Sequence, residues 1–66
     1  MKTLYTIIYT DAAHGTTGYE RKTERGAYQL AGRLMGKDNA RGVQIERTQF
    51  DASGTRTEII HTRGIS

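Results

Sequence analysis

The sequence predicts an α+β fold: a four-stranded, mainly antiparallel sheet with one helix packed on one face, in the order strand, strand, helix, strand, strand. Runs of β-branched and aromatic residues occur in the first and last thirds of the chain, and such runs are typical of strands. A segment between them has apolar residues at helical spacing. Two hairpins joined by one helix form a sheet with the helix on one side.

The first predicted hairpin occupies the N-terminal part of the chain. Residues 4–10 are rich in β-branched and aromatic side chains and predict the first strand. Residues 11–17 are expected to form a turn region, with Gly15 and then Gly18 as breakers. Residues 19–23 predict a shorter second strand. Its side chains are mostly charged, as is common at the edge of a sheet.

The predicted helix begins after Thr23, a suitable N-cap, and ends at Gly36. Glu24 falls in the first turn, where the helix dipole favours an acidic side chain. The apolar residues of this segment fall at positions i, i+3, i+4 and i+7, which form one face of a helix. This face is predicted to pack on the sheet, and it consists of Ala27, Leu30, Ala31 and Leu34.

Residues 43–49 and 55–63 predict the third and fourth strands, joined by a turn over residues 51–54. Phe50 lies on the opposite parity from Ile45, so we expect a bulge or a strong twist near Arg47. Both parities of the first strand carry large side chains. The sheet face away from the helix is therefore expected either to be wet or to meet another molecule.

Length and composition limit the class of protein. The chain has 66 residues, no cysteine and a net charge of +3, so we expect one domain, residues 1–66. The lack of cysteine excludes disulfides and thiolate ligands and fits a reducing, cytoplasmic compartment. The first residues contain no long apolar run, so we expect no signal peptide. No apolar stretch is long enough to span a bilayer, and no membrane partner is expected.

Positive charge is concentrated in residues 21–41, which hold six basic side chains against two acidic ones. Part of this segment repeats every four residues and predicts a stripe on the solvent side of the helix: Arg25, Gln29, Arg33 and Lys37. Such a surface attracts phosphates or acidic protein surfaces, whereas the alternative is a solvated face that only keeps the protein soluble. The predicted partner-binding residues are Arg21, Lys22, Arg25, Arg33, Lys37 and Arg41.

Four tyrosines are divided between the predicted core and the predicted interface. Tyr9 and Tyr19 are the interface candidates, because a tyrosine can stack on a base or anchor a protein contact. Tyr5 or Tyr28 is expected to complete a core that has few other large residues.

We expect no enzymatic activity, no cofactor and no metal site. A metal site needs three or four ligands at workable spacing, whereas His14 and His61 are far apart and are expected on the surface. A nucleophilic site needs a serine or cysteine held by a base, and Ser53 lies in a turn. Residues 36–42 follow a helix and enter a strand, which is the reverse of a Walker-type phosphate loop.

In outline, the chain resembles small phage-encoded anti-CRISPR proteins, in particular those that bind the Cascade surveillance complex of type I systems. The order of elements, the basic helix and the lead-in Met1-Lys2-Thr3-Leu4-Tyr5 carry this resemblance. It implies an inhibitor in the host cytoplasm that places basic and aromatic side chains on a host ribonucleoprotein complex and blocks target DNA. The six basic residues given above would have this role.

Two other functions remain open from the sequence. One is a DNA- or RNA-binding domain that uses the open sheet face, and the other is a homo-oligomeric module, such as a homodimer, whose open face pairs with itself. Salt dependence separates the inhibitor from the nucleic-acid-binding domain. Direct nucleic-acid binding weakens steeply with salt and needs no protein partner.

Overall fold

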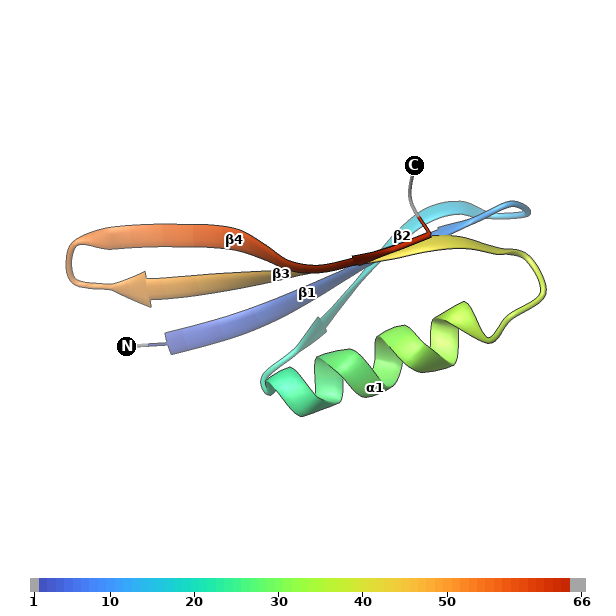
Figure 1. Cartoon of the computed structure of the whole chain (residues 1–66). Coiled ribbons are helices and arrows are strands. Elements are labelled where there is room, and N and C mark those ends of the chain that lie inside the picture. Colours follow the sequence, from blue (N-terminus) through green and yellow to red (C-terminus); the bar gives the residue numbers. More distant parts are fainter. Residues whose placement is uncertain (1, 65–66) are drawn as a thin grey trace.

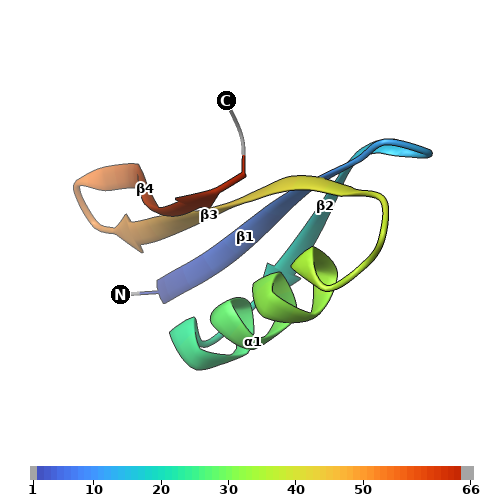
Figure 2. The same ribbon diagram turned by 45° about the vertical axis from the view of Figure 1, so that its right-hand side comes forward.

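The fold is a four-stranded antiparallel sheet with one helix on one face (Figure 1). The computed structural model describes residues 2–64. Its elements are β1 (Lys2–Asp11), β2 (Gly15–Arg21), α1 (Glu24–Met35), β3 (Ala40–Asp51) and β4 (Gly54–Arg63). The order in the sheet is β2-β1-β3-β4, and α1 lies across β1, β2 and β3 (Figure 2). The predicted α+β fold and the order of its elements are confirmed.

All four strands are longer than the sequence indicates. β2 begins at Gly15, four residues before its predicted start, and contains Gly18 as a paired residue. The turn before it is therefore short. Asp11 closes this turn because its Oδ1 accepts hydrogen bonds from the backbone N–H of Ala13 (2.7 Å) and of His14 (3.3 Å). Gly15 follows in the left-handed region at φ 79°, which glycine adopts without steric cost.

The helix has the boundaries and the buried face that its sequence predicts. The Thr23 side chain accepts a hydrogen bond from the backbone N–H of Gly26 at 3.1 Å, which satisfies one of the free donors of the first turn. Gly36 caps the other end and donates to the carbonyl of Arg33. The predicted face is buried, and it consists of Ala27, Leu30, Ala31 and Leu34.

The core lies between α1 and the two central strands. β1 contributes Ile7 and Tyr9, and β3 contributes Val43 and Ile45. Because paired residues share a face of the sheet, the register of Ile7 with Ile45 places one parity of each strand toward the helix. We call this side of the sheet the helix side, and we call the other the open face.

Phe50 stays on the open face, because the irregularity near Arg47 does not shift β3 against β1. The β1–β3 ladder runs without irregularity from Lys2 opposite Phe50 to Thr10 opposite Gly42. The irregularity lies instead in the β3–β4 ladder between Ile45 and Glu46, where the additional residue is Ile60 of β4. The parity of β3 is therefore preserved, and Phe50 is 39% exposed.

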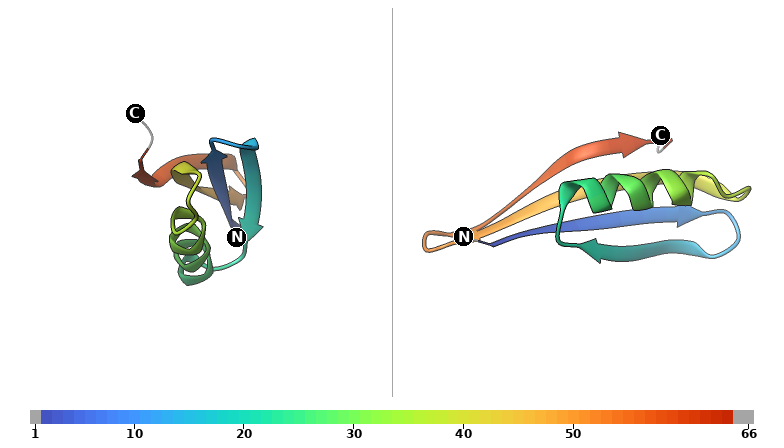
Figure 3. Two further views of the ribbon diagram at one scale, coloured as in Figure 1. Left: turned by 90° about the vertical axis from the view of Figure 1, so that its right-hand side faces the viewer. Right: turned by 90° about the horizontal axis from the view of Figure 1, so that it is seen from below.

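The β3–β4 hairpin extends well beyond the start of α1 (Figures 1 and 3), which gives the molecule principal extents of 42 × 20 × 17 Å. We call residues 47–58 the distal arm. An ion pair between Arg47 and Glu58 joins its strands across the helix side. Its turn is closed by Asp51, whose Oδ1 accepts from the backbone N–H (2.8 Å) and hydroxyl (2.7 Å) of Ser53. Gly54 then takes φ 135°.

Candidate basic binding surface

Six basic side chains surround the outer side of the helix, and all six residues are exposed. We call this set the basic surface; it consists of Arg21, Lys22, Arg25, Arg33, Lys37 and Arg41. Within residues 2–64, the ion pairs are those of Asp11 with His14 and of Arg47 with Glu58. No carboxylate in this part of the chain neutralises the basic surface.

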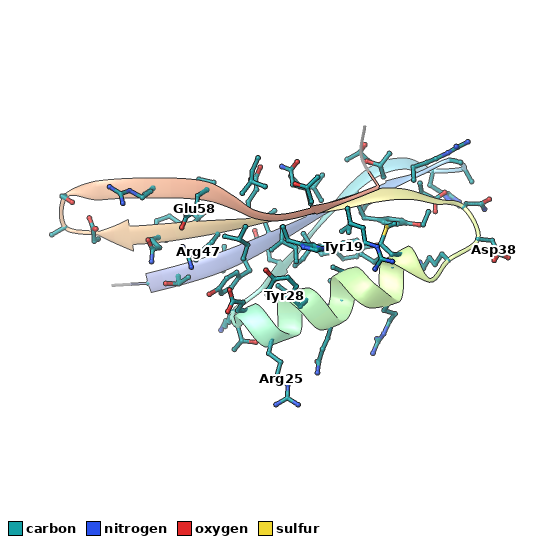
Figure 4. All side chains as sticks on the ribbon, in the orientation of Figure 1. Tyr19, Arg25, Tyr28, Asp38, Arg47 and Glu58 are labelled. Atoms are coloured by element: carbon teal, nitrogen blue, oxygen red, sulfur yellow. The ribbon has the colours of Figure 1, made fainter. Side chains whose placement is uncertain are left out.

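Arg21 and Arg25 lie at the start of α1, next to Lys22, and Arg33 lies in its last turn. Arg25 projects from the helix away from the sheet (Figure 4). Arg21 ends β2 on the helix side, opposite Tyr5 of β1, and it lines a shallow hollow together with Arg33, Gln29 and Leu30. Two arginines thus line one hollow, and arginine is the side chain best suited to bind a phosphate or carboxylate group.

Lys37 and Arg41 lie after the end of α1 and continue the basic surface beyond the helix. Lys37 follows the C-cap, and its backbone N–H donates to the carbonyl of Leu34. Its ammonium group lies 5.8 Å from the centre of the Tyr9 ring, within the range of a cation–π contact. Arg41 lies in the irregular part of the β1–β3 ladder, where Asp11 is opposite Ala40. The predicted stripe therefore lies on the helix only from Arg25 to Arg33, because α1 ends before Lys37.

The prediction that Tyr9 contacts a partner is wrong, because its side chain belongs to the core. Tyr9 is 3% exposed, and its hydroxyl donates to Asp11 Oδ2 at 2.7 Å. This hydrogen bond, with burial and the charge of Asp11, raises the pKa of Tyr9 to about 12. The same bond, with the backbone N–H of Ala13, lowers the pKa of Asp11.

The other three tyrosines differ in their exposure. Tyr19 lies on the helix side and packs partly buried against the core, so only part of its ring is available to a partner. Tyr5 packs against the core as expected. Tyr28 is 40% exposed, and its ring meets His61 edge-on with centroids 5.3 Å apart. Of the two tyrosines considered for the core, Tyr5 is therefore the one that packs there, and Tyr28 is accessible.

The spacing of residues in the helix indicates that Tyr28 lies at the edge of the buried face. It directly follows Ala27 and lies outside the face made by Ala27, Leu30 and Leu34, so it points toward the border between α1 and β4. Together with His61 and Gly32 it lines a second hollow between these two elements.

The open face differs in charge from the basic surface. The registers place only three charged side chains of the described strands there, namely Lys2, Glu20 and Glu46. Threonines occupy much of the rest, with Thr10 bonded to Thr16 at 3.4 Å and Thr48 to Thr57 at 3.1 Å. A surface with this charge offers little attraction to phosphates. The charge distribution favours the helix side over the open face for nucleic acid.

The described residues form no cluster of three or more histidines, aspartates or glutamates close enough to hold a metal ion. His14 Nδ1 lies 3.6 Å from Asp11 Oδ1, a pair that the sequence analysis missed although the two residues are three apart. The His14 side chain is 82% exposed. Between Lys2 and Gly64, α1 is not a membrane span, being too short and too polar.

Comparison of the chain with models of protein families, with curated proteins and with solved structures gives no match.

Proposed function

We propose that this protein is a phage or mobile-element inhibitor that binds a host nucleic-acid-handling complex stoichiometrically through its basic surface. The proposed target is a CRISPR-type ribonucleoprotein in the host cytoplasm, of which Cascade is the example that the resemblance implies. The mechanism is steric and electrostatic: the basic surface occupies a site meant for nucleic acid or pairs with an acidic protein surface.

The observation that supports this proposal is the set of six exposed basic residues that have no ion-pair partner among residues 2–64. Exposed charges contribute only about 0–1 kcal/mol each to folding, so stability does not account for the cluster. A guanidinium group has five N–H donors, and apart from one Arg21 donor bonded to the carbonyl of Glu20 (2.7 Å), these remain available to a phosphate or carboxylate group. Arg21 and Arg33 line the same hollow, so one anion there would lie near both residues.

The test is charge reversal at Arg25 and Arg33, which project from the outer side of α1. The double variant Arg25→Glu/Arg33→Glu should keep the circular dichroism spectrum and the melting temperature of the parent. Its binding to a purified, guide-loaded type I surveillance complex should fall at least about tenfold, or about 1.4 kcal/mol. Calorimetry with the parent protein and the variant measures both the affinity and the stoichiometry.

A single reversal supplies the matched control. Lys2→Glu changes the net charge by the same amount as Arg25→Glu, but Lys2 lies on the open face. Only Arg25→Glu should weaken binding. If both variants bind as the parent does, the basic surface is a solubility feature and the proposal fails. Binding of free DNA or RNA duplexes that weakens steeply with salt, with no binding to the complex, would identify a direct nucleic-acid-binding domain instead.

A further inference from the structure

The outer edge of the sheet along β4 is open in its first half. β4 is an edge strand, and residues 54–59 are all exposed. An edge strand offers a row of free backbone donors and acceptors to another strand, and proteins usually block it with charged side chains, proline, a bulge or a covering element. Residues 54–59 contain no proline, pair with β3 without irregularity, and lie beyond α1 (Figure 3). Their two charged residues, Arg56 and Glu58, have opposite signs, so they repel a second copy only in some registers. The opposite edge, β2, is shorter and contains Gly15 and Gly18.

We propose that two copies of this chain pair through β4, antiparallel and with the two-fold axis at Thr57, to form one continuous eight-stranded sheet. Residues opposite each other in an antiparallel pair share a face and lie about 4.5–5.5 Å apart at Cα. In this register Thr57 is opposite its own copy, and Arg56 is opposite Glu58 of the second copy. Two reciprocal ion pairs form on the helix side.

Charge selects this register over its neighbours. Moving the axis by one residue places either Arg56 opposite Arg56 or Glu58 opposite Glu58, and like charges directly opposite are destabilising. Moving it further toward the C-terminus makes the new ladder cross the irregularity at Ile60. Moving it further toward the turn leaves too few residues to pair. The register centred on Thr57 pairs opposite charges and uses only the regular part of β4.

The side chains around this register also fit a second copy. Arg47 already donates to Oε1 of Glu58, which leaves Oε2 for Arg56 of the other copy. On the open face, Ile59 comes opposite Thr55, which pairs with Phe50 in its own chain. Ile59 is 59% and Phe50 39% exposed, so pairing covers part of the apolar surface of the arm. Because the strands are antiparallel, the two helix-covered bodies lie at opposite ends of the dimer and do not collide.

A single introduced cysteine tests this arrangement directly, because the chain has no cysteine of its own. In the proposed dimer, Thr57→Cys places two thiols opposite each other across the axis, close enough for a disulfide. Thr62→Cys, on the same strand and the same open face, is the matched control and has no thiol opposite. Under mild oxidation, Thr57→Cys should give a covalent dimer on a non-reducing gel, and Thr62→Cys should stay monomeric. Equal cross-linking of both variants, or of neither, would overturn the proposal.

Charge complementation gives a second test that uses no cross-link. Arg56→Glu and Glu58→Arg should each weaken dimerisation at least about tenfold in sedimentation or light scattering. When the two variants are mixed, every acidic position of one strand faces a basic position of the other, so a mixed dimer should return. Circular dichroism of each variant verifies the fold. A parent protein that remains monomeric at its highest soluble concentration, or a mixture that stays monomeric, would show that β4 does not pair with itself.

Discussion

At the scale of single residues, Thr23 and Gly36 fix the two ends of α1: the Thr23 side chain accepts from the N–H of Gly26, and the N–H of Gly36 donates to the carbonyl of Arg33. Thr23, Gly36 and the buried helix face follow from rules that act within one turn, and the structure confirms them. Tyr9 is buried although it was expected at an interface, because burial of an aromatic residue in a strand depends on which strands become central. That information lies in long-range pairing, which a single strand's sequence does not contain.

The hydrogen bond from Tyr9 to Asp11 leads to a prediction about alkaline stability. The pKa of Tyr9 is raised from 10.0 to about 12, so its neutral form is favoured by the fold. This contribution to the free energy of unfolding is complete below pH 10 and is lost as the pH rises toward about 12. In Tyr9→Phe, the fall in melting temperature over this range should be shallower than in the parent.

The dependence of stability on pH should also change at acidic pH in Tyr9→Phe. The pKa of Asp11 is lowered from 3.8, first of all by the Tyr9 hydroxyl, so its contribution is present above that value and is lost as the pH falls through the folded pKa. Without the hydroxyl, the pKa of Asp11 should rise, which NMR titration of its carboxyl group measures. Tyr19→Phe is the control, because it leaves the partner of Asp11 in place. Unchanged pH profiles in Tyr9→Phe would show that the bond does not form in solution.

At the scale of elements, the sequence predicted each strand and the helix but not the length of the strands or their neighbours. β3 extends to Ala40 and Asp51 because its backbone finds partners on both sides, in β1 and β4. The residues near the ends of β3 are mostly polar, so they do not show the alternation of apolar and polar residues that predicts a strand. Each hairpin pairs two strands that are neighbours in the sequence. The pairing of β1 with β3, which places Ile7 opposite Ile45, joins strands that are separated in the sequence by β2 and α1.

The two glycines inside α1 should respond differently to alanine. A Cβ on Gly32 meets nothing within 4 Å, so Gly32→Ala should stabilise the protein by up to about 1 kcal/mol through helix propensity. A Cβ on Gly26 would lie 2.9 Å from Thr23 Oγ1, which disturbs the N-cap. Gly26→Ala should therefore gain less than Gly32→Ala or lose stability. Thermal melts of the two variants compare them, and an equal gain at both positions would contradict this account of the cap.

At the scale of the whole molecule, the core lies at one end, and the distal arm at the other end is exposed to solvent on both faces of the sheet. The fully buried side chains Ile7, Val43 and Ile45 lie under the helix, while the distal arm depends on pairing and on contacts such as Arg47 with Glu58. The basic surface and the β4 edge also lie apart, one around α1 and the other along the arm (Figure 4). The sequence predicted where positive charge is concentrated. The distance between the basic surface and the β4 edge could be seen only once the pairing of the strands was known.

Large-to-small substitutions should reveal this uneven distribution of stability. Leu34 is 3% exposed and packs in the core, so Leu34→Ala should cost about 2–5 kcal/mol, which is a large part of the free energy of unfolding of about 5–15 kcal/mol that is typical of native proteins. Ile59→Ala removes a similar side chain from the arm, where Ile59 is 59% exposed, and should change stability by less than about 0.5 kcal/mol. Denaturant unfolding at high dilution measures both variants as monomers. Because the arm has no core of its own, Leu34→Ala should also speed amide hydrogen exchange throughout the sheet, including residues 47–58. A melting curve for Leu34→Ala that overlays the parent would mean that this face of α1 does not hold the domain together.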